Sequence, residues 1–218
     1  MAWKKFSILG HSMGGGLGCL FSATHPEMVE GLVMLDMIKP APVSRNTKDL
    51  ISRTRLSLDT FIKLEDKLSL KGEKVYKTEE EAVRRLKEGA ASDHGDSLSD
   101  DSARIMTRRG VRSKEEGFIF TRDLRHRSIG LYGFSDEVLQ EFARQVQCPH
   151  LVIKATDSPR YDSAESDNAI LPIYKQNPMF DFVSVQGSHH VHLNSPELIV
   201  PHIEKFVNKH FQNWLMTD

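Results

Sequence analysis

Hydrophobic residues along this chain gather into short continuous runs, separated by segments with helical spacing. Runs of strand length occupy Phe6–Leu9, Leu32–Leu35 and Leu151–Ile153, and Phe180–Val185 is a further candidate. Continuous apolar runs of this length are typical of parallel strands that are covered on both faces. We therefore expect a buried, mostly parallel sheet.

Helical patterns lie between these runs. Ser135 is placed as an N-cap before a segment whose apolar residues share one helix face, namely Val138, Leu139, Phe142 and Val146. The C-terminal segment repeats this spacing but contains Pro201, so we expect either a kink there or a short turn at Pro196 followed by a new helix. Strands that alternate with helices predict the α/β fold class.

The sequence Gly10-His11-Ser12-Met13-Gly14 matches the G-x-S-x-G nucleophile elbow. In that motif the serine sits on a strained turn between a strand and a helix, and the two glycines leave room beside it. The flanks agree, because a strand-length apolar run precedes the motif and apolar residues at helical spacing follow it. This context favours Ser12 as a nucleophile over an ordinary Gly-Ser turn.

Three segments carry a resemblance to a known family: 6–15 (FSILGHSMGG), 25–36 (HPEMVEGLVMLD) and 187–197 (GSHHVHLNSPE). Together they resemble the α/β-hydrolase fold enzymes, and most closely the serine hydrolase-like, Kraken-related proteins. The resemblance covers nearly the whole chain. It implies a serine hydrolase for a small ester or acyl substrate, with a Ser-His-Asp triad and with neither cofactor nor metal.

A serine hydroxyl is a weak nucleophile near neutral pH and needs a histidine base within reach. His189, His190 and His192 lie on the loop after a predicted strand. The family's G-x-H pattern falls on Gly187-Ser188-His189, so the resemblance selects His189 as the base. His190 and His192 are then supporting residues or polar surface. The position of this cluster after Ser12 in the chain favours a catalytic role.

The acid that orients the histidine has three candidates. Asp157 is the first choice, because it follows the apolar run that ends at Ala155 and so lies at the carboxyl end of a predicted strand. Its spacing departs slightly from the usual family pattern. Asp162 is the near alternative, and Asp36 is another because some hydrolases of this fold place the acid after the preceding strand. For each aspartate the plainer interpretation is a turn residue or a helix cap.

Stabilisation of an oxyanion requires backbone amides near the serine, and the amide of Met13 is one expected donor. The family takes a second donor, and several strands, from segments before the elbow, which have no counterpart before Phe6. We therefore expect a truncated sheet whose edge strand carries Ser12 and is open to self-association. A lost donor lowers the rate by about a hundredfold or more, which predicts impaired activity, as in an alternatively spliced isoform.

Composition divides the chain into three parts. Residues 1–39 hold the elbow strand, its helix and the next strand, and 128–218 hold the later part of the hydrolase core. Residues 40–127 are rich in charged, helix-forming residues, and the resemblance implies a helical cap there. Phe118–Phe120 and Leu131 either line an acyl pocket in that cap or form its own packing.

Two helix starts are expected inside the cap segment. Thr78 and Glu81 have the spacing of a capping box, and Ser99 precedes a pair of aspartates. Glu88–Asp101, rich in Gly, Ala, Ser and Asp, predicts a loop.

The 218 residues carry 29 Lys and Arg against 30 Asp and Glu, a formal net charge of −1. This balance argues against nucleic-acid binding, which requires a basic face. No apolar run has the length of a membrane span, and two cysteines offer no disulfide framework. We expect a cytoplasmic protein, and the resemblance leaves a perinuclear or peroxisomal association open. The alternative to a hydrolase is a non-catalytic product that acts by association or is incompletely folded.

Overall fold

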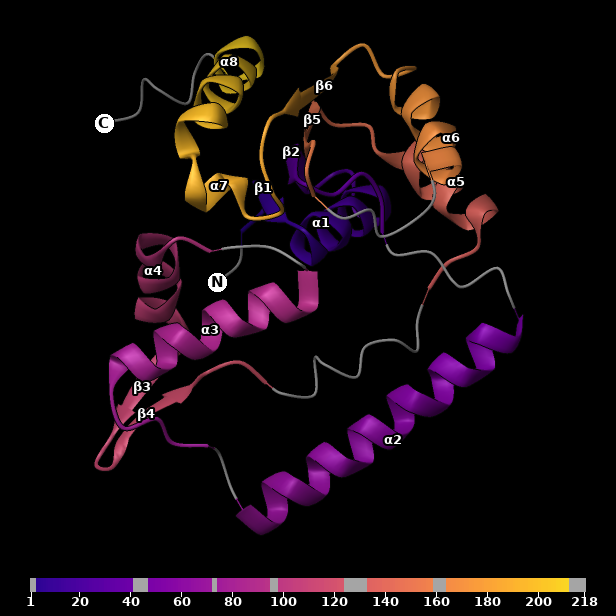
Figure 1. Cartoon of the computed structure of the whole chain (residues 1–218). Helices are drawn as coiled ribbons and strands as arrows, with labels where there is room; N and C mark the ends of the chain where they lie inside the picture. The colour runs from indigo at the N-terminus through magenta and orange to yellow at the C-terminus, as the bar shows by residue number, and fades with distance from the viewer. Residues whose placement is uncertain are drawn as a thin grey trace. The chain divides into compact units, whose positions relative to one another are not determined.

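The computed structural model describes residues 3–40, 47–71, 74–94, 98–123, 133–158 and 164–211. The chain divides into two compact units, whose elements are labelled in Figure 1. The first unit combines Met1–Pro42 with Phe134–Asp218, and the second is Val43–Gly133.

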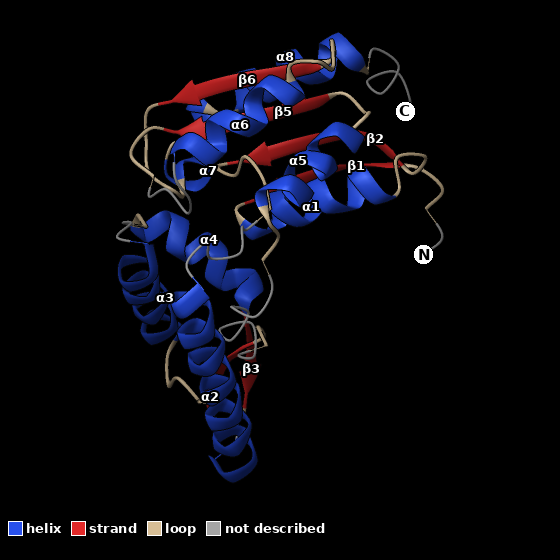
Figure 2. Cartoon of the chain, turned by 90° about the vertical axis from the view of Figure 1, so that its right-hand side faces the viewer, coloured by secondary structure: helices blue, strands red, loops and turns tan. Residues whose placement is uncertain are grey.

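The first unit is built on a parallel sheet with the strand order β1-β2-β5-β6, drawn as arrows in Figure 2. Its strands are β1 (Phe6–His11), β2 (Val29–Leu35), β5 (His150–Ala155) and β6 (Phe180–Val185). Each strand contains one of the four apolar runs, so the strand predictions are confirmed. The register sets His11 beside Leu35 and Leu35 beside Ile153, so β1 and β2 end level and β5 continues to Ala155.

Helices cover both faces of this sheet. One face packs against α1 (Met13–Thr24), α5 (Asp136–Gln145) and α6 (Ala164–Tyr174). The other packs against α7 (Val191–Asn194), the 3-10 helix η2 (Pro196–Leu198) and α8 (Val200–His210). In Figure 1, α8 lies on one side of β5 and β6, and α5 with α6 lies on the other.

Alternation along β2 explains why its apolar run is continuous. Leu32 and Met34 join the cluster under α1, α5 and α6, whereas Val33 and Leu35 join the cluster under α8. All four side chains are buried. Both faces of the strand therefore need apolar side chains, as the sequence pattern predicted.

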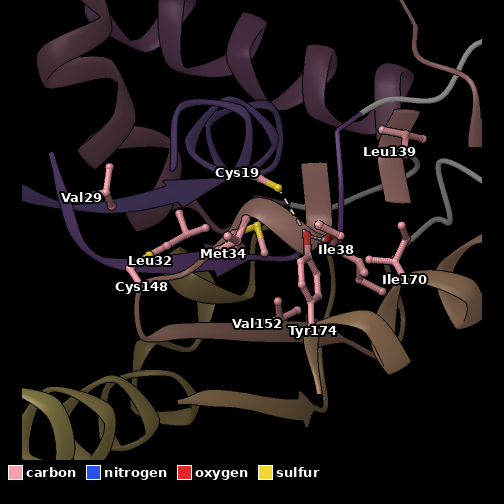
Figure 3. Packing of buried hydrophobic residues seen from close by; sticks show 12 residues of the cluster. Cys19, Val29, Leu32, Met34, Ile38, Leu139, Cys148, Val152, Ile170 and Tyr174 are labelled. Atoms are coloured by element: carbon pink, nitrogen blue, oxygen red, sulfur yellow. Dashed lines mark hydrogen bonds between the residues drawn. The ribbon is translucent and has the colours of Figure 1, made fainter. Parts of the chain in front are cut away.

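The cluster under α1, α5 and α6 contains two linked hydrogen bonds at the buried hydroxyl of Tyr174, whose side chain is drawn in Figure 3. The Tyr174 hydroxyl donates to the carbonyl oxygen of Ile38 at 3.0 Å, and Cys19 Sγ lies 3.3 Å from the same hydroxyl oxygen. Burial raises the pKa of the Cys19 thiol to about 11, so the thiol stays protonated and donates to the phenol oxygen. These bonds satisfy the polar groups that the core encloses.

The expected helix starts in the first unit are confirmed. Ser135 Oγ accepts a hydrogen bond from the amide of Val138 at 3.4 Å, as an N-cap does. In the C-terminal segment η2 begins at Pro196, and α8 has Pro201 in its first turn. Proline is tolerated there because amides in the first turn have no acceptor inside the helix. Of the two alternatives for this segment, the turn followed by a new helix is correct.

The second unit contains three helices and a hairpin among its described residues. They are α2 (Thr47–Lys71), α3 (Glu79–His94), α4 (Asp100–Gly110), β3 (Val111–Lys114) and β4 (Gly117–Phe120). Ser99 caps α4 by accepting from the amide of Ser102 at 3.0 Å. Thr78 Oγ1 accepts a hydrogen bond from the amide of Glu81 at 3.2 Å, and the Glu81 carboxylate accepts one from the amide of Lys77 at 2.9 Å.

The loop predicted over Glu88–Asp101 is wrong at both ends, because α3 continues to His94 and α4 begins at Asp100. Ala82, Val83 and Ala90 are buried and extend one apolar stripe along the helix, and α3 packs against α4. The alanines favour helix strongly enough to carry it through Gly89.

The hairpin residues Phe118–Phe120 take part in the second unit's own packing. Ile119 is fully buried, and the Phe120 ring packs edge-on against Tyr76 with 5.3 Å between centroids. Leu131 lies outside the described residues. Among the described helices, none combines the length and hydropathy that a membrane span requires.

Candidate active site

The elbow joins β1 to α1 through Ser12, whose φ of 53° places a non-glycine residue in the left-handed region. Such strain is typical of functional sites. A Cβ on Gly10 would lie 2.3 Å from the carbonyl oxygen of Gly14, so only glycine fits at position 10. A Cβ on Gly14 would meet no atom within 4 Å. The close approach therefore explains the first glycine of the motif and not the second.

The carboxyl ends of the strands meet at one edge of the sheet through backbone hydrogen bonds. The amide of Ser12 donates to the carbonyl of Leu35 at 2.9 Å, and the amide of Asp36 donates to Ile153 at 2.7 Å. Ser12 and Asp36 therefore follow neighbouring strands at the same level. In α/β proteins this edge is where ligands bind.

Asp36 stands directly after β2 and has a φ of 50°, the second strained non-glycine residue described in the chain. Its carboxylate accepts hydrogen bonds from His189 Nδ1 at 2.5 Å, Lys154 Nζ at 2.5 Å and the Ala155 amide at 3.0 Å. The Ser158 hydroxyl also donates to it. A carboxylate that is 2% exposed is thus held by four donors.

Burial alone would raise the pKa of the Asp36 carboxyl. Hydrogen bonds from His189, Lys154 and Ser158 more than offset that effect and hold the pKa below its usual value. Asp36 is therefore ionised near neutral pH, the form that orients an imidazole and stabilises its positive charge.

Asp157, the first choice as the acid, is not the partner of His189. Its amide donates to the carbonyl of Gly187 at 2.9 Å, and its exposed carboxylate accepts from Gln186 Nε2 at 2.5 Å and Thr156 Oγ1 at 3.1 Å. The turn after β5 points this side chain to solvent, while the neighbouring Ser158 points toward Asp36. Asp162 lies outside the described residues.

His189 is 1% exposed and pairs with Asp36 through Nδ1, which leaves Nε2 as the remaining ring nitrogen. Ser12 is half-buried, and its hydroxyl makes no hydrogen bond to His189 among the described contacts. Catalytic hydrogen bonds are often long before substrate binds, so this geometry is compatible with a serine and base pair. His190 is buried and His192 half-buried.

His11 contacts the histidine loop, a role that the sequence did not reveal. Its Nε2 lies 2.8 Å from the backbone oxygen of His189. Its ring centroid lies 4.5 Å from that of His189, 5.4 Å from His190 and 4.0 Å from His192. Burial, with the nearby rings of His192 and His189, lowers the pKa of His11 to about 3. The ring is therefore neutral near physiological pH.

Met13 begins α1, so its amide belongs to the helix turn whose first amides have no partner inside the helix. Its side chain is 54% exposed. Within the described ranges, no group of three or more His, Cys, Asp or Glu side chains is arranged to hold a metal ion.

Comparison with known proteins identifies sequence relatives and structural neighbours of the chain. No family model matches the chain. A serine hydrolase-like protein of Danio rerio is 35% identical over 95% of this chain, which spans 62% of that protein's length. Among solved structures, a hypothetical protein of Pseudomonas aeruginosa PAO1 aligns with a TM-score of 0.68 at 22% identity, covering 97% of this chain and 69% of its own.

A second solved structure, an E-2-(acetamidomethylene)succinate hydrolase, aligns with a TM-score of 0.62 at 19% identity, covering 94% of this chain and 67% of its own. At 22% and 19% identity the two solved structures establish the fold alone. The 35% identity to the Danio rerio protein shows a relationship in sequence. The chain has the α/β-hydrolase fold and is a relative of the serine hydrolase-like proteins.

Proposed function

We propose that this chain carries the catalytic residues of a serine hydrolase. Ser12 is the nucleophile, His189 is the general base and Asp36 is the acid that orients it. The observation that carries the proposal is the buried hydrogen bond between His189 Nδ1 and Asp36 Oδ2 at 2.5 Å, beside a strained elbow serine.

The roles follow from the protonation states. Asp36 is ionised and accepts from Nδ1–H, so Nε2 is the ring nitrogen of His189 that can take up a proton. That nitrogen takes the proton of the Ser12 hydroxyl as the oxygen attacks an acyl carbon. The same proton then goes to the leaving group, and water repeats the cycle on the acyl-enzyme.

The amide of Met13 is proposed as one donor to the oxyanion that forms during attack. It follows the nucleophile directly and begins a helix, whose N-terminal amides favour negative charge. The substrate class we propose is a small ester or another activated acyl compound. The relatives' names support hydrolysis without specifying the acyl group.

Covalent labelling tests this function. The purified chain is incubated with a fluorophosphonate probe, and the fraction modified is measured by intact mass, beside Ser12→Ala as the control. We expect stoichiometric labelling of the wild-type chain and none of the variant. Absent labelling of a folded wild-type chain would refute the proposal, as would equal labelling of the variant.

A second candidate function is self-association, which one specific observation favours. β1 is an outer strand of the described sheet, and large apolar residues on or next to β1 and α1 are exposed. Trp3, Leu9 and Leu17 are 65%, 57% and 57% exposed. We propose that a second copy of the chain pairs with this edge. Light scattering after size exclusion should give a dimer that Leu9→Lys converts to a monomer, and a monomeric wild-type chain would refute it.

A further inference from the structure

The base has to cross the sheet to reach the nucleophile. His189 follows β6 and Ser12 follows β1, and these are the outer strands of the described sheet. Three strand spacings of about 4.8 Å separate them by roughly 14 Å, beyond the length of a histidine side chain. The backbone after β6 therefore has to turn back along the carboxyl ends of β5 and β2. Figure 2 places α7, which follows this turn, at those ends.

Gly187 makes the turn possible. Its φ of 144° is one that residues with side chains rarely adopt, and a Cβ there would lie 2.6 Å from the side chain of Val191. A turn of this kind brings the loop back across the sheet but does not fix its distance from Ser12.

Two contacts on different strands hold the returning loop. Asp36, after β2, binds the His189 side chain, and His11, the last residue of β1, binds the His189 backbone oxygen at 2.8 Å. The first contact sets the orientation of the ring. The second ties the backbone of the base to the residue that directly precedes Ser12.

We propose that His11 is a positioning residue, which donates Nε2–H to the carbonyl of His189 and thereby fixes the base at its distance from Ser12. The inference rests on the function proposed above. His11 acts through His189 and contacts no reacting atom.

The charges around His11 agree with this role. The rings of His189, His190 and His192 all contact it, and burial keeps it neutral. A neutral ring with its proton on Nε2 can donate to a carbonyl oxygen. A positive ring beside His189 would oppose the positive charge that the base acquires when it accepts the serine proton. A neutral donor avoids that repulsion.

Two substitutions separate the hydrogen bond from the packing. His11→Phe keeps the ring and removes the donor, whereas His11→Gln keeps an amide donor. We expect the rate of fluorophosphonate labelling, and kcat for p-nitrophenyl acetate, to fall by between about tenfold and a hundredfold in His11→Phe, with KM unchanged. His11→Gln should recover most of the rate. His25→Phe, at an exposed histidine at the end of α1, is the matched control and should change nothing.

Hydrogen exchange provides a readout that does not depend on activity. Amides in 187–194 should exchange faster in His11→Phe than in the wild-type chain, and His11→Gln should restore their protection. Equal and measurable labelling rates in the wild-type chain and His11→Phe, or unchanged exchange, would overturn the positioning role. A wild-type chain that does not label, while His11→Phe speeds exchange in 187–194, would refute the proposed function but support the contact of His11 with the loop.

Discussion

Replacing Asp36 by asparagine distinguishes Asp36 from Asp157, two of the three acids that the sequence offers. The native carboxylate accepts from His189, Lys154, Ala155 and Ser158, whereas an asparagine has one acceptor oxygen and one donor group. If the oxygen keeps Lys154 and the Ala155 amide, the NH₂ group faces His189 Nδ1. The imidazole must then carry its proton on Nε2, where it can no longer accept the serine proton.

The magnitude follows from that tautomer. The equivalent change in a serine protease lowers kcat by about 10⁴-fold, and we expect a fall of about 10³- to 10⁴-fold here. Lys154, which is 18% exposed, also loses its counter-charge. Breaking a largely buried ion pair costs about 3 kcal/mol of folding free energy. The variant should therefore unfold at a lower temperature as well as react slowly.

The assay is the pseudo-first-order rate of fluorophosphonate labelling, measured well below the melting temperature of each variant. Asp157→Asn is the control, because the Asp157 carboxylate is exposed and bonded to Gln186, and its rate should match the wild type. Wild-type rates in Asp36→Asn would refute the proposal that Asp36 is the acid that orients His189. A slow Asp157→Asn beside a normal Asp36→Asn would restore the acid expected from the sequence.

Three further predictions concern stability. Burial lowers the pKa of His150 to about 4 from 6.5, so the unfolded chain binds more protons below pH 6.5 and stability is lost as pH falls from about 6.5 toward 4. By pH 5 the loss in free energy of unfolding is about 2 kcal/mol. Urea unfolding at pH 7 and pH 5 should show a smaller loss in His150→Phe, whose ring fits the same aromatic surroundings. Gly10→Ala should abolish Ser12 labelling and lower the melting temperature, because its Cβ would collide with the Gly14 carbonyl. Tyr174→Phe leaves the buried carbonyl of Ile38 without its donor and should cost about 1 to 3 kcal/mol in urea unfolding.

The inner strands β2 and β5 could be predicted from the sequence because they are apolar on both faces. The runs at Leu32–Leu35 and Leu151–Ile153 contain no polar residues, so they predict strands that are covered on both faces. The elbow motif marks the turn from β1 to α1. The length of a helix was harder to predict from the sequence than the position of a strand. The residues that end a helix in isolation, such as Gly89, are overridden when an apolar stripe continues past them.

The hydrogen-bond partner of His189 could not be chosen from the sequence, because Asp36 and Asp157 both follow apolar strands that end at the same edge. The choice depends on the backbone after each strand. The positive φ of Asp36 turns its carboxylate toward the Ala155 amide, whereas the turn after β5 exposes Asp157. His11 was missed because it occupies a variable position of the motif. Its partner is a backbone oxygen 178 residues away, a contact that no sequence pattern encodes.

The proton on His189 Nδ1 provides the most direct test of the pairing between His189 and Asp36. Proton NMR of the folded chain should contain one resonance far downfield of the backbone amides, because the short hydrogen bond to a buried carboxylate deshields that proton. We predict that the resonance disappears in Asp36→Asn and persists in Asp157→Asn. A resonance that survives Asp36→Asn, or its absence from the folded wild-type chain, would contradict the pairing of His189 with Asp36.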